Sequence, residues 1–209
     1  VSWDPLGEYI VSLGGDRCIN IMTFSMGILK SISKSCKIFY GENLETLFRR
    51  LTWSPQGSLL VAPCGIINNG ANTTNGGTIT TAENAVYIFT RASLTTPGPA
   101  RAVAMLKFRK PPLVVRFSPY RFEPSSSVAH NDAESPVFTG GNSDDACYLF
   151  AVATADTVSV FESTTLRCVC TVGNIHYAGI TDLTWARAGL LLVASTDGFV
   201  SAVNIRYER

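Results

Sequence analysis

The feature that most constrains the fold is a short unit that recurs four times along the 209 residues. Each unit starts with an apolar and aromatic run that ends at a turn, and further strand-like runs follow it. The anchoring aromatic residues are Trp3, Trp53, Phe117 and Trp185, and each of the first three stands two positions before a proline. A recurring unit of this kind predicts a repeat architecture, in which each copy packs against its neighbours.

Turn residues divide each unit into short strands. In the first unit, runs at residues 1–3, 9–13 and 18–22 are separated by Asp4-Pro5-Leu6-Gly7 and by residues 14–17. Proline fixes φ and glycine permits a positive φ, so the Pro-x-Gly pattern predicts a tight turn. Candidates for a fourth, outermost strand follow the first three units, at residues 28–32, 102–108 and 167–172. Groups of four short strands predict an all-β protein of the β-propeller class.

The unit boundaries predict four blades, at about residues 1–34, 35–107, 108–172 and 173–209. The anchor aromatics at positions 3, 53, 117 and 185 are 50, 64 and 68 residues apart, which exceeds the roughly 40–45 residues of a WD-repeat blade. We therefore expect insertions at residues 63–84 and 123–146. A third excursion, at residues 35–50, joins two blades, and Asn43 begins a run with the apolar spacing of a short helix.

Composition excludes two broad classes of protein. No apolar run approaches the roughly 18 residues that cross a bilayer, so we do not expect an integral membrane protein. The 17 Lys and Arg against 16 Asp and Glu leave a net charge of +1, which provides no overall field for steering toward nucleic acid. The six cysteines lie mostly in strand-like sequence without the spacing of a zinc site, and we expect reduced core thiols in a reducing compartment.

Three polar residues near the end of the chain have the spacing of a WD-repeat hydrogen-bond network. His176 stands nine positions before Trp185, and Ser195 stands two before Asp197, in a predicted turn. A histidine, a turn aspartate and a serine form such a network, although Val203 stands where a tryptophan would complete it. The alternative is a catalytic triad, but Ser195 would lie inside a strand, without the exposed turn that a nucleophile needs. We therefore expect a structural role and no catalytic centre.

Two basic clusters remain. Arg49 and Arg50 follow Phe48, and with Tyr40 they give the excursion the aromatic and arginine composition of a protein-binding surface. The alternative is that both arginines pair with carboxylates at a blade junction. The second cluster, which brackets Pro111-Pro112, consists of Lys107, Arg109, Lys110 and Arg116. It predicts either a solvated strand end or a site for acidic side chains or phosphate.

Five segments, in order along the chain, resemble the family of WD-repeat middle subunits of chromatin assembly factor 1. They are Trp3-Asp4-Pro5-Leu6-Gly7 with residues 9–11, residues 47–60 starting Leu-Phe-Arg-Arg-Leu, residues 86–91, residues 150–158, and Asn174-Ile175-His176-Tyr177 leading to Ser195-Thr196-Asp197-Gly198. The resemblance implies a seven-bladed WD40-type β-propeller, of which this chain is the C-terminal portion with four blades. Expressed alone, such a portion is expected to associate through its uncovered terminal blades.

The resemblance also implies a function. It implies a non-enzymatic scaffold in a nuclear complex that deposits core histones on replicating DNA, with the large subunit of that complex and core histones as partners. We expect no cofactor, metal, membrane or small-molecule substrate, and no sequence-specific binding of nucleic acid. The alternatives are a Hir-type histone chaperone in replication-independent assembly, a generic WD-repeat scaffold, a propeller enzyme and a direct nucleic-acid binder. Residues 87–91 and 174–177 disfavour the Hir-type chaperone. The sequence near the anchor aromatics lacks the converging acidic residues that a propeller enzyme would need.

Overall fold

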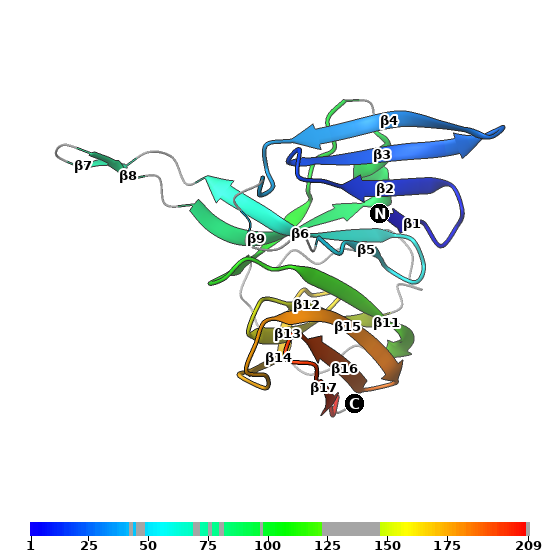
Figure 1. Cartoon of the computed structure of the whole chain (residues 1–209). Coiled ribbons are helices and arrows are strands. Elements are labelled where there is room, and N and C mark those ends of the chain that lie inside the picture. The colour runs from blue at the N-terminus through cyan, green and yellow to red at the C-terminus, as the bar shows by residue number, and fades with distance from the viewer. Residues whose placement is uncertain are drawn as a thin grey trace, which may run out of the picture. The chain divides into compact units, whose positions relative to one another are not determined.

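The computed structural model describes residues 1–41, 44, 49–68, 72–74, 77–79, 82–96, 98–122 and 147–207. The chain forms two compact units, Val1–Leu113 and Val114–Arg209. Among the described residues, each unit contains two antiparallel sheets of three or four strands, and the first unit also contains a two-stranded sheet (Figure 1). Of the helices in the described ranges, none is long and apolar enough to cross a membrane.

The first sheet is built by four strands in sequence order: β1 (Ser2–Trp3), β2 (Tyr9–Leu13), β3 (Cys18–Ser25) and β4 (Ile28–Cys36). The predicted Asp4-Pro5-Leu6-Gly7 turn joins β1 to β2, where the amide of Gly7 donates to the carbonyl of Asp4 and Gly7 has φ of 80°. The backbone of a residue with a Cβ atom is strained at such a φ, so glycine is the favoured residue at position 7 of this turn.

The second sheet has the order β10-β9-β6-β5 and surrounds the first predicted insertion. Its strands are β5 (Thr52–Trp53), β6 (Leu59–Asn68), β9 (Ala82–Thr90) and β10 (Ala104–Phe108). The short strands β7 (Asn72–Thr74) and β8 (Gly77–Ile79) pair with each other between β6 and β9. We expected the insertion at residues 63–84 to be a loop, and this is wrong for both of its ends. There, β6 and β9 continue as strands and stay paired as far as Asn68 and Ala82.

One face of each of these two sheets is buried in a common core within the first unit. Val11, Ile19 and Ile21 alternate on β2 and β3 and are fully buried, together with Leu60 and Phe89 of the second sheet. This alternation is the period of two that places every second strand residue on one face. The short helix α1 (Arg91–Thr95) contributes Leu94 to the same core, and it begins with Thr90, whose hydroxyl caps the amide of Ser93.

The second unit repeats the arrangement. Its four-stranded sheet consists of β11 (Val114–Phe122), β12 (Cys147–Ala153), β13 (Thr157–Glu162) and β14 (Cys168–Gly173), again in sequence order. The last sheet has three described strands, β15 (Ile180–Arg187), β16 (Leu190–Ser195) and β17 (Val200–Asn204). All seven residues of β12 are buried, which is expected of a strand covered on both faces.

These four sheets confirm the predicted all-β class and its grouping of strands into blades. The predicted outermost strands are present as β4, β10 and β14, whereas the sequence analysis did not predict α1. The predicted helix beginning at Asn43 and the insertion at residues 123–146 lie outside the described residues. The blade boundaries, the membership of all four sheets in one domain and the count of seven blades stay predictions.

One expectation about the cysteines is wrong. Cys18 is disulfide-bonded, and its Cα lies opposite that of Cys36 in the pairing of β3 with β4. The spacing of cysteines along a sequence does not show which of them are bonded, so this bond was not predicted. Cys64, Cys147, Cys168 and Cys170 form no disulfide.

Candidate functional site

The excursion proposed for partner binding is held in place by Arg49. Its guanidinium donates to two consecutive carbonyls, those of Tyr40 and Gly41, the second at 2.7 Å. Phe39, the residue before Tyr40 in the chain, is fully buried in the core of the first unit. Arg49 therefore binds the backbone of its own excursion, and these contacts do not show the alternative, a pairing with a carboxylate.

Tyr40 and Arg50 lie on either side of this contact. The hydroxyl of Tyr40 donates to Asn84 at 2.6 Å, and burial raises the pKa of that hydroxyl, with a smaller contribution from the nearby Cys64. Arg50 is half-buried, and its amide donates to the carbonyl of Leu113 at 2.9 Å. Phe48 lies outside the described residues. A role in partner binding stays a prediction for all four residues.

Cys64, beside this excursion, illustrates why a buried thiol here is not a nucleophile. Burial raises the pKa of Cys64 to about 12, although the positive charge of Arg49 acts in the opposite direction. Only the thiolate is reactive, so at neutral pH this side chain is inert. Its Sγ donates to the carbonyl of Pro112 at 3.2 Å, and the thiol therefore serves to hold two segments together.

The structure brings His176 and Asp197 together but leaves Ser195 to other partners. Nδ1 of His176 lies 3.2 Å from the carboxylate of Asp197, and its Nε2 lies 3.2 Å from the carbonyl of Val193. The hydroxyl of Ser195 instead donates to the carbonyls of Ala178 and Gly179, at 3.0 and 3.1 Å. Both ring nitrogens of His176 are engaged, so no nitrogen is left to activate the serine as a triad requires.

Asp197 holds the turn between β16 and β17. Its carboxylate accepts from the amides of Phe199 and Tyr177, at 3.0 and 3.1 Å. These contacts lower the pKa of Asp197, the bond from Phe199 having the largest effect, and His176 adds to the lowering. A carboxylate that organises backbone donors in this way supports the local structure. The geometry therefore matches the structural reading of His176, Ser195 and Asp197.

A charged network that was not predicted joins the two four-stranded sheets of the first unit. Arg91, the first residue of α1, makes a bidentate contact with Asp4 at 2.9 and 2.7 Å, and it also contacts Glu8 at 2.6 Å. Its guanidinium lies over the rings of Tyr9 and Trp53, with 4.8 and 5.7 Å to the ring centroids. We call Arg91, Asp4 and Glu8 the sheet-joining network.

Asp4 is the buried member of this network. Its side chain is 0% exposed, whereas that of Arg91 is 21% exposed. Burial alone would raise the pKa of Asp4, but the hydrogen bonds from Arg91 and from the amides of Leu6 and Glu8 outweigh it and lower the pKa. Asp4 and Arg91 lie in two of the segments that carried the family resemblance, which is the one signal that singled them out.

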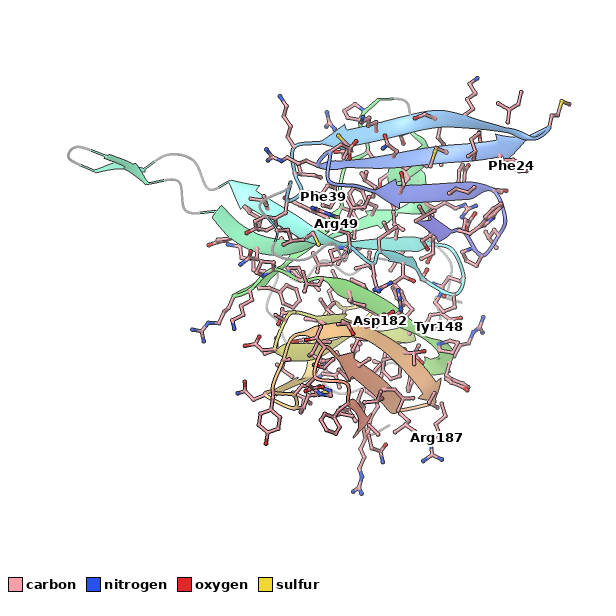
Figure 2. The ribbon with its side chains drawn as sticks, in the orientation of Figure 1. Phe24, Phe39, Arg49, Tyr148, Asp182 and Arg187 are labelled. Carbon is pink, nitrogen blue, oxygen red and sulfur yellow. The ribbon has the colours of Figure 1, made fainter. Side chains whose placement is uncertain are left out.

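Of the second basic cluster, Arg116 is engaged within the second unit. It contacts both carboxylate oxygens of Asp182, at 2.9 and 3.2 Å, and donates to the carbonyl of Leu183 (Figure 2). The cluster is therefore divided: Arg116 pairs β11 with β15, whereas Lys107 and Arg109 lie at the end of β10 and are exposed. The described part of the chain holds no group of three or more His, Cys, Asp or Glu residues that could bind a metal ion.

Apolar side chains are exposed on the first sheet. Trp3 is 57% exposed and contacts Phe24 edge-on, with ring centroids 6.3 Å apart. Phe24, which Figure 2 shows near the β3–β4 turn, is 51% exposed, and Met26 in that turn is 98% exposed. The face of the first sheet that points away from the core is thus rich in exposed apolar surface.

Comparisons with known proteins identify the family. A family model described as "CAF1B/HIR1 beta-propeller domain" matches residues 1–209. The chain is 31% identical to the CAF1B protein of chromatin assembly factor 1 from Saccharomyces cerevisiae, over 100% of this chain and 46% of the relative. It is 25% identical to protein HIR1 of Cryptococcus neoformans var. neoformans, over 97% of this chain and 20% of the relative. It therefore spans less than half the length of these relatives.

A solved structure agrees on the fold. The WD40 domain of Toxoplasma gondii coronin superimposes with a TM-score of 0.55 at 14% identity, over 98% of this chain and 42% of that chain. At such an identity the likeness concerns the fold alone, and it confirms the predicted WD40-type blades. Together with the match to the family model over every residue, the four antiparallel sheets lead to one conclusion. The chain belongs to the CAF1B/HIR1 β-propeller family.

Proposed function

We propose that the chain is a non-enzymatic WD-repeat scaffold of a histone chaperone complex that deposits core histones on DNA during replication, in the nucleus. The observation that carries the proposal is the relationship to the CAF1B protein of chromatin assembly factor 1, at 31% identity over the whole chain. Identity to HIR1 relatives is lower, at 25–26%. Because the chain is only part of the length of either relative, the activity of the complete protein is part of this proposal.

The contacts of the polar residues support a scaffold more than an enzyme. His176 and Asp197 hold a turn, Ser195 donates to backbone carbonyls, and Arg49 supports its own excursion. Side chains that are engaged in this way stabilise a surface, whereas catalysis requires a nucleophile, a base and a reacting atom to converge on one point. The proposal therefore includes no cofactor and no small-molecule substrate.

The proposed partners are the large subunit of chromatin assembly factor 1 and core histones. We place part of their binding surface on the excursion that contains Tyr40, Phe48, Arg49 and Arg50, because aromatic residues and arginine are enriched where proteins bind each other. Replacing Arg49 and Arg50 by Glu in the full-length protein is expected to weaken capture of one of these partners. The control is Arg187→Glu, an exposed arginine of the second unit.

Since Arg49 also binds the carbonyls of Tyr40 and Gly41, the double variant needs a second readout. Arg50→Glu alone leaves that contact intact and is expected to weaken capture, and its melting temperature, measured in parallel, shows whether the fold is retained. Full capture of both partners by the single and the double variant would refute this placement of the surface.

The deciding experiment for the function is affinity purification of the full-length protein from replicating cells. Recovery of the large subunit of chromatin assembly factor 1 with core histones supports the proposal. Recovery of Hir-complex subunits instead supports the second candidate, a Hir-type chaperone in replication-independent assembly, which the family model and the HIR1 relatives favour. Recovery of neither leaves a generic WD-repeat scaffold and refutes the histone chaperone proposal.

A further inference from the structure

The near-neutral net charge conceals a strong division between the two units. Residues 1–113 contain eleven Lys and Arg against six Asp and Glu, whereas residues 114–209 contain six Arg, no Lys and ten Asp and Glu. The first unit thus has a formal charge of +5 and the second a formal charge of −4. Charge asymmetry of this size between parts of a chain indicates a charged binding partner.

Two arginines of the first unit contribute less to an open basic surface, because their guanidinium groups bind within the protein. Arg49 donates to the carbonyls of its excursion, and Arg91 pairs with Asp4. Arg17 donates to the carbonyls of Phe39 and Lys37 but stays exposed. The positive charge that faces solvent therefore comes mainly from other side chains of this unit.

A regular row of exposed side chains runs along β10 and the residues at its two ends. Five alternate residues are exposed, while the residues between them are half-buried. Val103 and Met105 are 42% and 49% exposed, and the side chain of Lys107 is 60% exposed. We call this row the β10 stripe; its members are Arg101, Val103, Met105, Lys107 and Arg109.

The cations of the β10 stripe are open to a partner. Lys107 contacts Glu83 at 2.6 Å, and its own side chain is 60% exposed, whereas that of Glu83 is 38% exposed. Ion pairs at the surface contribute little, so this contact leaves Lys107 able to meet a partner. Arg101 and Arg109 form no ion pair with any residue that the structure describes. The stripe therefore presents three cations and two apolar side chains on one face, each two positions along the chain from the next.

The backbone next to the stripe can also take part in binding. β10 is the terminal strand of its sheet, in the order β10-β9-β6-β5. A terminal strand offers unpaired N–H and C=O groups to an added strand. An extended segment has the same period of two as β10, so its alternate side chains would lie beside Arg101, Val103, Met105, Lys107 and Arg109 in turn.

The mixture of charge and apolar surface distinguishes a peptide from a nucleic acid. A duplex presents a regular array of phosphates, which would pair with the cations but leave Val103 and Met105 without apolar contact. A segment that carries both acidic and apolar side chains on the face it shares with the stripe complements both kinds, because residues two apart in an extended segment lie on one face. Charge complementarity of this sort also speeds association and selects the partner.

We propose that β10 is a docking surface for an extended acidic segment of a protein partner, one face of which carries both acidic and apolar side chains. The proposal rests on the proposed function, because it describes how a scaffold of this family captures one of its partners. It assigns that capture to a part of the first unit other than the Tyr40–Arg50 excursion.

The test measures binding of a fluorescently labelled peptide, about ten residues long, which spans the stripe at about 3.3 Å per residue. In this peptide Ser alternates with Glu, Glu, Val, Val and Glu in turn, the order that complements the stripe in an antiparallel pairing, and we call it the alternating peptide. The full-length protein is titrated with this peptide, with a peptide of the same composition in two blocks, and with duplex DNA. The alternating peptide is expected to bind most tightly. Arg101→Glu with Arg109→Glu should weaken it by at least about tenfold, since two favourable charge contacts become repulsive.

Two further variants separate the parts of the stripe. Arg187→Glu with Arg206→Glu makes the same charge change at exposed positions of the second unit and should leave peptide binding within about twofold. Met105→Gln keeps the charges and should weaken the alternating peptide more than the block peptide. Equal binding of both peptides, preference for DNA, or equal losses in the two double variants would overturn the proposal.

The outcome is separable from the function test. A wild-type protein that fails to bind the alternating peptide, yet captures the large subunit of the assembly factor, refutes the docking surface and leaves the proposed function standing. A protein that binds the peptide through the stripe but recovers neither assembly-factor nor Hir subunits refutes the proposed function and leaves the docking surface standing. Circular dichroism melts of each variant show whether a loss of binding reflects unfolding.

Discussion

Replacing Arg91 with Met would remove the guanidinium from Asp4 while keeping most of the aliphatic stem that lies near Tyr9 and Trp53. The substitution leaves a fully buried carboxylate without its cation. Two hydrogen bonds remain to this carboxylate, from the amides of Leu6 and Glu8, at 3.1 and 3.2 Å. The variant therefore tests how much the sheet-joining network stabilises the first unit.

The magnitude follows from the burial of the two partners. Removing one partner of a fully buried ion pair costs about 3–5 kcal/mol. Arg91 is 21% exposed, and the two backbone donors still compensate part of the negative charge of Asp4. We therefore expect a loss of about 2–3 kcal/mol in the free energy of unfolding.

The measurement is urea unfolding of the full-length protein, followed by tryptophan fluorescence. The matched control is Arg167→Met. Its partner Glu162 is also buried, at 1% exposed, but Arg167 is 57% exposed, and Thr165 and Tyr207 still donate to Glu162. The control should lose less than about 1 kcal/mol. Equal losses in both variants, or a loss below about 0.5 kcal/mol in Arg91→Met, would refute the assigned role of burial.

Three more predictions follow from the same contacts. Gly7 and Gly57 both have positive φ, at 80° and 76°, but an added Cβ meets nothing at Gly7 and lies 3.0 Å from Asp4 at Gly57; Gly57→Ala should therefore lower the melting temperature more than Gly7→Ala, and equal shifts would contradict this. His176→Ala should lower the melting temperature without changing peptide or partner capture, whereas an unchanged melt with lost function would favour a functional histidine. The pKa values of Asp4 and Glu162 are lowered in the folded protein, so the stability that these groups contribute is complete above about pH 5 and is lost as the pH falls below about 4; urea unfolding at about pH 7, 5 and 3.5 should show a decrease only at the lowest pH, and Asp4→Asn should reduce that decrease.

The strand pattern could be predicted because it depends on local sequence. Pro5 and Gly7 specify a turn wherever they occur, and alternating apolar residues such as Val11 and Ile19 bury the same face of any sheet. The fourth strands were predicted for the same reason. The ends of β6 and β9 were not, because residues 63–68 and 82–84 are kept extended by pairing with each other rather than by their own composition.

The contacts of the candidate site depend on distance in space, and the sequence predicts them less well. His176 and Asp197 follow a known spacing, whereas Arg91 and Asp4 are separated by 87 positions and belong to no short motif. Arg49 was expected to bind a partner or a carboxylate, but its nearest acceptors are main-chain carbonyls, which every residue carries and no composition reveals. The charge division between the units became apparent only when the structure separated residues 1–113 from the rest.

The sheet-joining network has a consequence for how the first unit opens. Arg91 directly follows β9, and Asp4 directly follows β1. Because these two side chains are paired, the two sheets cannot separate without breaking this contact and exposing the buried carboxylate of Asp4. Amide protons in β2 and in β9 should then exchange with deuterium at a shared rate, as one opening event. Two successive sheets of the chain would thus behave as one cooperative folding element.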